Sequence, residues 1–589
     1  MRLIGLNIDR KRTNKFILKG LKDDWYPFGN FDSQPPYGRL VHSKLNDSIY
    51  NIPNCPHLSV SLSCIVGKNG SGKSTIIDIV YAIINNFSYT YLRDKERKYN
   101  VQIEPANGIY ADLVYELNGK IGIIKNENNS VTLFFNNEKI SADKFVLHKH
   151  LSEAFFYTIG LNYSIYSFNT NDYACDENPQ INGIWLDSLF HKNDGYLSPI
   201  CLNPFRELGN IDINKENSLA LKRLSAFALF FESRNQNFIP GYRPVEIEYI
   251  LISNYEKYIE KKVYSMGERM PEEDDVMTIY NRLKECYYSF IPQRGNEKII
   301  GHILSYLAYK TIKIALTYAD FYNDLRLDRL DILMEKIADD SSHITLKIKQ
   351  CEEFAKKSIY NKFGGNKYRI DVKDILKNQE IKSYEDIFKL LPPPFYDLDV
   401  IFSKQEEKYN SNISFKRMSS GEQQLLFSVS TILYHLKNLE SVNDDTNRVH
   451  YEHICIILDE IELYSHPEFQ RNFINDLLEK ISWIKLEGII KGIHFLLVTH
   501  SPFILSDVLT ENTLYLNDGK YVKKDDYESF GANYYRLLKE SFFLGNNAIG
   551  EIASKTYKSI CNGEIGYTDD LFGDPLMNSF IKYIHKNKQ

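Results

Sequence analysis

A glycine-rich loop between a strand-like run and a helix-like run constrains the fold of this chain more than any other feature. The loop Gly67-Lys68-Asn69-Gly70-Ser71-Gly72-Lys73-Ser74 fits G-x-x-x-x-G-K-[ST] without a mismatch. Residues 58–66 before it are apolar enough for a buried strand, and residues 74–84 after it are apolar at helical spacing. Glycines let backbone N–H groups turn toward phosphate oxygens, and a helix N-terminus attracts the same anion. The loop therefore predicts a phosphate-binding site.

Individual roles within the loop follow from side-chain chemistry. Lys73 is expected to reach the β- and γ-phosphates of ATP, and Ser74 to supply a hydroxyl to Mg²⁺. A chance match is the alternative, and the strand before and helix after argue against it. The other residues expected to line the nucleotide are Gly67, Asn69, Gly70, Ser71, Gly72 and Thr75.

Two short apolar runs late in the chain, 454–458 and 495–498, are typical of buried parallel strands that end in polar residues. Asp459 and Glu460 follow the first run, where a desolvated acidic pair is costly unless it binds a cation. Asp459 is expected to hold Mg²⁺, and Glu460 to act as a general base toward water. Capping of a following helix is the simpler alternative. His500 ends the second run, where a structural role is the commoner one for an isolated histidine.

A third polar motif, Met418-Ser419-Ser420-Gly421-Glu422-Gln423, precedes an apolar helix-like run. Alone it would be an ordinary helix N-cap. Because it lies between the glycine-rich loop and the acidic pair in the sequence, it resembles the signature of ABC ATPases, in the Ser-Gly-Glu form of SMC- and Rad50-like proteins. Ser420 stands where those families usually have a glycine, which puts a close backbone approach to phosphate in doubt. His500 then resembles the switch histidine that contacts the γ-phosphate.

This resemblance implies a fold and an assembly. The fold class is α/β: an ABC-type (SMC/Rad50-like) P-loop ATPase head with an antiparallel β lobe and a large, mostly helical insertion. Ser419, Gly421 and Glu422 would complete the ATP site of a second subunit, giving a homodimer or higher oligomer joined through its ATP heads. The expected units are 1–165 and 396–515 for the two parts of the head, 166–395 for the insertion, and 516–589 for a tail that docks a partner or a second copy.

Three further stretches narrow the resemblance. Residues 460–467 resemble a motif of OLD-family and PtuA-type ATPases, with Glu462 and His466 at their D-loop equivalent, although His466-Pro467 also suits a helix start. Residues 162–166 and 190–206 resemble the PtuA ATPases of Septu and retron-linked antiphage systems, where a separate HNH nuclease is the usual partner. Packing loops are the alternative. The resemblance implies a sensor or scaffold subunit of a defence complex.

No nuclease site is expected in this chain. Fewer than 90 residues follow Ser501, and the acidic pairs there are adjacent, unlike the spaced carboxylates of a two-metal Toprim site. Contact with DNA or a retron RNA–DNA is encoded weakly. The cationic and aromatic stretch 356–369 would suit it, and a solvated loop is the favoured alternative.

Composition limits which other classes of protein function are possible. The net charge of −6 excludes a uniformly basic DNA binder, and eight scattered cysteines without a C-x-x-C pair favour a reducing cytoplasm. No apolar stretch approaches bilayer length, so no membrane association is expected. The alternative functions are a DNA repair or recombination ATPase (RecF/Rad50-like) that binds DNA directly and a non-catalytic, nucleotide-gated scaffold. A transporter subunit fits worst.

Overall fold

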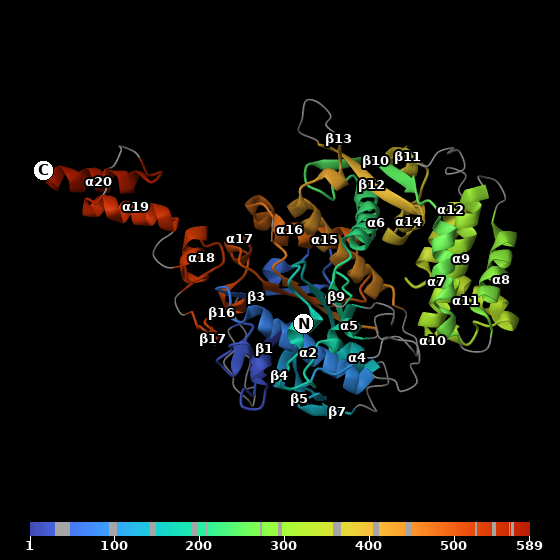
Figure 1. The fold of residues 1–589 in the computed structure, drawn as a ribbon, viewed down its shortest axis with the longest axis horizontal. Coiled ribbons are helices and arrows are strands. Elements are labelled where there is room, and N and C mark those ends of the chain that lie inside the picture. The colour runs from blue at the N-terminus through green and yellow to red at the C-terminus, as the bar shows by residue number, and fades with distance from the viewer. Residues whose placement is uncertain are drawn as a thin grey trace.

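The computed structural model has an α/β core to which a helical region and an extended C-terminal helix pair are attached (Figure 1). It describes the chain apart from residues 30–46, 53, 93–102, 142–148, 191–197, 208, 271–273, 292–296, 357–366, 405–411, 443–449, 464, 525–526, 545–548, 565, 567–570 and 589.

A seven-stranded sheet joins the two ends of the chain. Its order is β17-β16-β3-β15-β14-β8-β9, and every neighbouring pair is parallel except β16 and β17. The α/β class and the parallel strands predicted from the apolar runs are confirmed. The strands are β3 (Ser59–Gly67), β8 (Tyr157–Leu161), β9 (Ile200–Asn203), β14 (His453–Asp459), β15 (Gly492–Val498), β16 (Thr513–Asn517) and β17 (Lys520–Tyr521).

A six-stranded antiparallel sheet packs beneath α2 (Lys73–Phe87), in the order β2-β1-β4-β5-β6-β7. The Asn118-Gly119 and Asn136-Asn137 turns have positive φ at both residues, as two-residue hairpin turns require, so the predicted small antiparallel sheet is confirmed. The strands are β1 (Arg2–Ile8), β2 (Trp25–Pro27), β4 (Ile109–Leu117), β5 (Lys120–Asn128), β6 (Ser130–Phe135) and β7 (Glu138–Ile140).

The opposite side of the central sheet carries α15 (Ser420–Glu440) and α16 (Pro467–Ile484) (Figure 1). Buried apolar side chains such as Ile432 and Leu436 pack α15 against the core. Short helices complete the head around these layers: α1 (Lys15–Leu18), α4 (Lys149–Ala154), α5 (Ile184–Asp187) and α17 (Pro502–Leu505).

The region between the two parts of the head is helical but not wholly so. A four-stranded antiparallel sheet, β11-β10-β12-β13, contains strands that the sequence pattern did not predict. They are β10 (Tyr242–Leu251), β11 (Lys367–Asp371), β12 (Tyr396–Lys404) and β13 (Asn412–Ser414). The helices are α6 (Ile213–Glu232), α7 (Tyr255–Tyr264), α8 (Val276–Phe290), α9 (Glu297–Thr317), α10 (Ala319–Tyr322), α11 (Leu330–Asp339), α12 (Leu346–Lys356), α13 (Val372–Leu376) and α14 (Tyr384–Leu390).

Helix α9 is long and apolar enough to cross a bilayer by length and composition, but 72% of its most apolar window is buried inside the protein. It packs against α7, α8 and α12, as the core helix of a bundle does. Most of the cationic stretch 356–369 lies outside the described residues. Of its described cations, Lys367 pairs with Glu248 at 2.9 Å, and Arg369 pairs with Glu248 at 2.8 Å.

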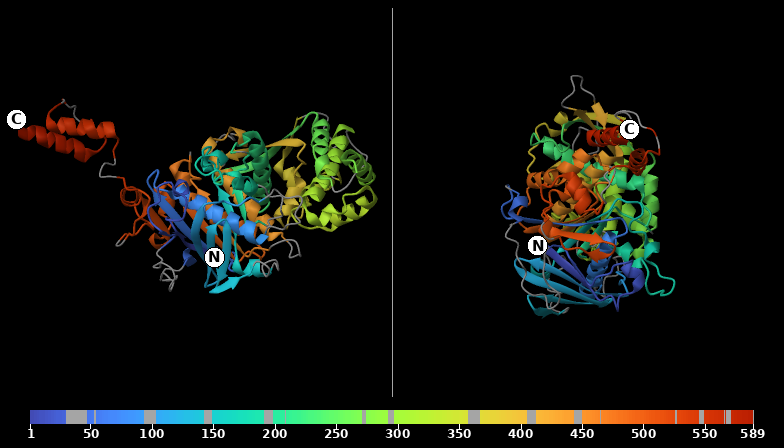
Figure 2. Two further views of the ribbon diagram at one scale, coloured as in Figure 1. Left: turned by 60° about the horizontal axis from the view of Figure 1, so that its bottom comes forward. Right: turned by 90° about the vertical axis from the view of Figure 1, so that its left-hand side faces the viewer.

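The C-terminal segment contains α18 (Tyr534–Glu540), which packs on α17, and then the hairpin of α19 (Glu551–Asn562) and α20 (Pro575–Lys588). The hairpin extends away from the rest of the chain, as Figure 1 and the left view of Figure 2 show. Tyr534 and Tyr535 are exposed, whereas Leu537 is buried, so α18 is amphipathic.

Candidate nucleotide site

The glycine-rich loop connects β3 to α2 and has the backbone geometry that its glycines allow. Gly70 and Gly72 have φ of +74° and +98°, which side-chain-bearing residues rarely adopt. A Cβ atom at Gly67 would lie 2.2 Å from the carbonyl oxygen of Leu516 in the neighbouring strand β16. All three glycines of the loop are therefore required by backbone conformation or by close packing, independently of any ligand.

Lys73 begins α2 and turns its side chain back over the loop. Its Nζ donates to the carbonyl oxygens of Gly67 and Lys68, each at 3.2 Å. Burial lowers the pKa of Lys73, and the nearby carboxylates of Glu460 and Asp459 oppose that shift. The loop lysine and the acidic pair predicted from separate motifs therefore share one site.

Asp459 ends β14, and its carboxylate is held by a residue of the adjacent strand. Asn162, directly after β8, donates from Nδ2 to Oδ2 of Asp459 at 2.7 Å. The other oxygen, Oδ1, is buried without a hydrogen-bond partner. Burial, reinforced by the charge of Glu460, raises the pKa of Asp459 to about 8. A desolvated carboxylate with an unsatisfied oxygen, near Lys73 of the phosphate loop, fits the oxygen ligands that Mg²⁺ prefers.

Glu460 follows in a left-handed backbone conformation, with φ of +51°. Its N–H donates to the carbonyl oxygen of Val498 at 2.9 Å, so the strained turn is tied to the end of β15. Oε1 of Glu460 lies 3.3 Å from Nε2 of His500, and the hydrogen bond from His500 lowers the pKa of Glu460. The helix-capping alternative does not apply to these acids, because α16 begins later and His466 is its N-cap.

Glu462 is buried and binds the backbone of His500. It accepts hydrogen bonds from Oγ1 of Thr499 and from the backbone N–H of His500, the latter at 2.9 Å. Burial raises the pKa of Glu462 despite these bonds. His466 accepts from the N–H of Glu468 at 3.2 Å, so the predicted helix start at His466-Pro467 is confirmed. Tyr464 of the same motif lies outside the described residues.

The signature-like segment begins α15 with a capping box. Glu422 N–H donates to Ser419 Oγ, and the Ser419 N–H donates back to the Glu422 carboxylate at 2.9 Å. Ser419 and Ser420 are exposed, whereas Gly421 is buried. The N-cap interpretation is thus correct, and it leaves the two hydroxyl-bearing residues on the surface.

Asn162 is a site residue that none of the sequence motifs predicted. The stretches 162–166 and 190–206, predicted separately from the sequence, meet in the structure at Arg206. Arg206 is buried and donates through its guanidinium to the carbonyl oxygens of Ser164 at 2.6 Å and Asn162 at 3.2 Å. Burial lowers its pKa to about 10. Residues 191–197 of the second stretch lie outside the described residues.

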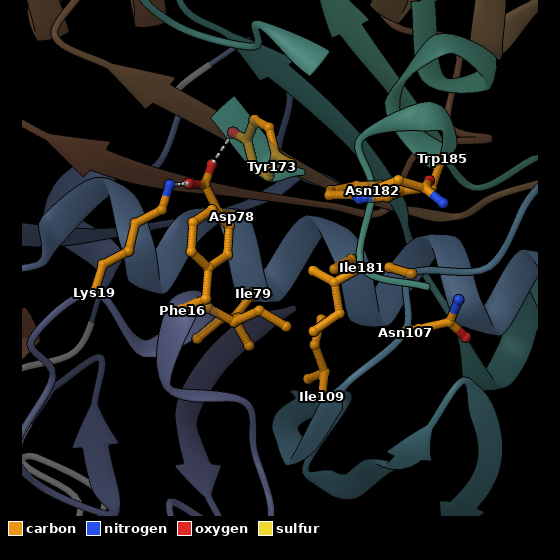
Figure 3. A pocket seen from close by; sticks show the side chains of 13 residues that line it. Phe16, Lys19, Asp78, Ile79, Asn107, Ile109, Tyr173, Ile181, Asn182 and Trp185 are labelled. Carbon is orange, nitrogen blue, oxygen red and sulfur yellow. Dashed lines mark hydrogen bonds and ion pairs between the residues drawn. The ribbon is translucent and has the colours of Figure 1, made fainter. Parts of the chain in front are cut away.

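A small apolar pocket lies one turn further along α2 (Figure 3). Asp78 accepts a hydrogen bond from the Tyr173 hydroxyl at 2.8 Å and lies 3.8 Å from the Lys19 ammonium. Burial raises the pKa of Asp78. Because its polar groups satisfy one another at the rim, this pocket is a packing feature next to the nucleotide site.

A parallel sheet with a phosphate loop after one strand and an acidic pair after another defines the class of P-loop ATPases. A family profile described as an AAA ATPase domain matches residues 55–505, and the chain belongs to this family.

Two curated proteins show partial similarity. The "Retron Vc95 probable ATPase" of Vibrio cholerae serotype O1 biovar El Tor is 27% identical over 216 residues, or 36% of this chain and 38% of that protein. The "Retron Ec83 probable ATPase" of Escherichia coli is 31% identical over 121 residues, or 20% of this chain and 19% of that protein. The matches thus span less than two fifths of either relative.

Proposed function

We propose that this protein binds ATP with Mg²⁺ and hydrolyses it at a site built from Lys73, Asp459, Glu460 and His500. The observation that carries the proposal is the convergence of these side chains at the carboxyl ends of β3, β14 and β15. Ligands bind at this edge in parallel α/β sheets, since the loops there leave the strands in the same direction.

Each residue has a role that its environment suits. Lys73 exchanges its two carbonyl contacts for phosphate oxygens, and Asp459 with Ser74 holds the cation, which when bound offsets the phosphate charge. Glu460 remains ionised because of its lowered pKa and orients the attacking water. His500, hydrogen-bonded to Glu460 and fixed through its backbone by Glu462, is positioned to contact the terminal phosphate.

The active assembly is an ATP-sandwich dimer of ABC/SMC-like heads, which can associate further. Ser419 and Ser420 are exposed at the start of α15, where backbone N–H groups and a helix N-terminus favour an anion. A second copy's ATP is the anion that we assign to this segment. ATP binding then controls assembly, and hydrolysis releases it.

The biological role that we assign is antiphage defence in the cytoplasm. The names of the two relatives associate them with retrons. The protein would serve as sensor and scaffold for a separate HNH-type nuclease, with DNA or a retron RNA–DNA as a further partner and without membrane association. Co-purification of a neighbouring HNH protein with the wild-type chain tests this part of the proposal, and its failure to bind would exclude the assignment.

Nucleotide-dependent assembly is tested by measuring molar mass in solution with and without Mg²⁺·ATP. Glu460→Gln is expected to form a stable dimer with ATP, because nucleotide binds but is not consumed. Lys73→Ala is expected to stay in the nucleotide-free state. Equal masses for all samples, with and without ATP, would contradict the sandwich.

A further inference from the structure

A cluster of cations lies within the helical insertion, away from the ATP site. It comprises Lys222 on α6, Lys310 and Lys313 on α9, and Lys347 on α12; we call these four residues the lysine cluster. Figure 1 shows α6 at the side of the head from which the helices α7 to α12 extend. The lysines of the cluster are partly buried, unlike most lysines, which are solvated.

Helical spacing places the charges close together. Lys310 and Lys313 are three residues apart and share one face of α9, where like charges repel each other. Helix α12 packs on α9, and the charge of Lys347 at its start acts on both Lys310 and Lys313, so the three ammonium groups lie near one another. The strongest charges acting on Lys310 and Lys313 are all cationic. Burial, reinforced by these charges, lowers the pKa of Lys313 to about 8 and also lowers that of Lys310.

Among the described residues, the lysine cluster has no acidic side chain paired with it. Within the described part of the chain, no side chain of the lysine cluster has an ion pair or a hydrogen bond. Asp397 acts on Lys222, and its attraction is weaker than the combined effect of burial and Lys347. The cations of β11 differ from the lysine cluster, because Lys367 and Arg369 pair directly with Glu248. Partly buried, uncompensated charge destabilises the free protein, so an anionic ligand is the natural partner.

Two cations with aromatic neighbours extend the cluster outward. Lys215, seven residues before Lys222 and so on the same face of α6, lies 4.5 Å from the centre of the Phe205 ring. Lys262 on α7 lies 4.3 Å from the centre of the exposed Tyr258 ring. Both cations act on Lys313. Proteins that bind single-stranded nucleic acid combine cations that contact its phosphates with aromatic rings on which its bases stack.

We propose that the lysine cluster binds the phosphates of single-stranded nucleic acid between α6, α9 and α12. A single strand can bend its backbone toward partly buried ammonium groups, which a stiff duplex cannot do. None of these lysines belongs to the ATP site, so a loss of nucleic-acid binding can be distinguished from a loss of ATP hydrolysis.

The test measures binding of a fluorescent 20-nucleotide oligo-dT and of the matching oligo-U to the full-length protein at several salt concentrations. Lys310→Met combined with Lys313→Met is expected to weaken binding at least about tenfold. The salt slope should fall by about 1.4, as expected for two lost contacts to a single strand. Lys555→Met with Lys558→Met, the same spacing on exposed α19, is the matched control and should bind as the wild type does.

Two further measurements distinguish nucleic-acid binding from a structural role of the lysines and from binding of small phosphates. The melting temperature of the α9 double variant should be unchanged or higher, since repulsive charge is removed, and its basal ATPase rate should be unchanged. Tripolyphosphate binding, measured in a Lys73→Ala background, distinguishes small phosphates from nucleic acid. Unchanged oligonucleotide binding by the α9 double variant would overturn the proposal, even with tripolyphosphate binding lost. A lower melting temperature with unchanged binding would assign the lysines a structural role instead.

Discussion

Asn162 donates a 2.7 Å hydrogen bond from Nδ2 to Oδ2 of Asp459, and so links the ends of β8 and β14. The bond fixes one carboxylate oxygen and leaves Oδ1 buried and unpaired. This arrangement keeps Asp459 in place at the cost of desolvating it, and burial raises its pKa to about 8. The raised pKa therefore favours the protonated form of Asp459 when no cation is bound.

Cation binding should displace that proton. At pH 7, a group with a pKa near 8 is mostly protonated, so binding of Mg²⁺·ATP is expected to release about one proton from Asp459. Calorimetric titrations in buffers of different ionisation enthalpy measure the number of protons released. The released proton should be absent in Asp459→Asn, and equal release by both proteins would contradict the role of Asp459.

Stability should depend on pH in a defined direction. The pKa of Asp459 is raised from 3.8 to about 8, so the folded state binds more protons than the unfolded state between these values. The contribution of Asp459 to the free energy of unfolding should thus fall as pH rises from about 4 to 8. Urea denaturation of the nucleotide-free protein at pH 5 and pH 8 tests this. Asp459→Asn should reduce the loss of stability between them, and an identical loss would exclude the shift.

Glu460→Gln should lower the ATP hydrolysis rate by roughly 10²- to 10⁴-fold, the range for losing a general base. The affinity for ATP should change little, because the amide keeps the size and shape of the side chain. Phosphate release and nucleotide binding are measured separately. Glu468→Gln on the exposed start of α16 is the control. An unchanged hydrolysis rate in Glu460→Gln would remove Glu460 from the mechanism.

Glu462→Ala leaves the Thr499 hydroxyl and the His500 N–H without their buried acceptor. We expect a loss of about 1–3 kcal/mol in the free energy of unfolding, together with slower hydrolysis, because His500 is no longer fixed. Glu462→Gln retains an acceptor oxygen and should recover most of both. Equal effects of alanine and glutamine would show that the hydrogen bonds do not matter.

The loop, its flanking strand and helix, and the strand before Asp459 were predictable because their chemistry is local. Gly70 and Gly72 adopt conformations that glycine favours, and residues 454–458 form an apolar run with an acidic end. Strand β8 was not predicted, since Tyr157–Leu161 carries no periodic pattern. Its pairing with β14 brings Asn162 to Asp459, a contact between residues far apart in sequence.

The lysine cluster could not be predicted for the same reason. Lys222, Lys310 and Lys347 lie on three separate helices, and each looks like an ordinary solvated lysine in the sequence. Stretch 356–369 carries several cations close together in the sequence, yet its described cations on β11 pair with acids. Tertiary packing decides which charges are neutralised, and sequence proximity does not.

Mixing two inactive variants tests the central claim, a composite ATP site, most directly. Lys73→Ala removes the phosphate-loop lysine, and Ser419→Arg blocks the exposed signature segment. In a sandwich dimer, a mixed pair has one intact site, so an equimolar mixture should recover about one quarter of the wild-type ATPase rate after random exchange. A mixture no more active than the two variants measured separately would contradict a site shared between subunits.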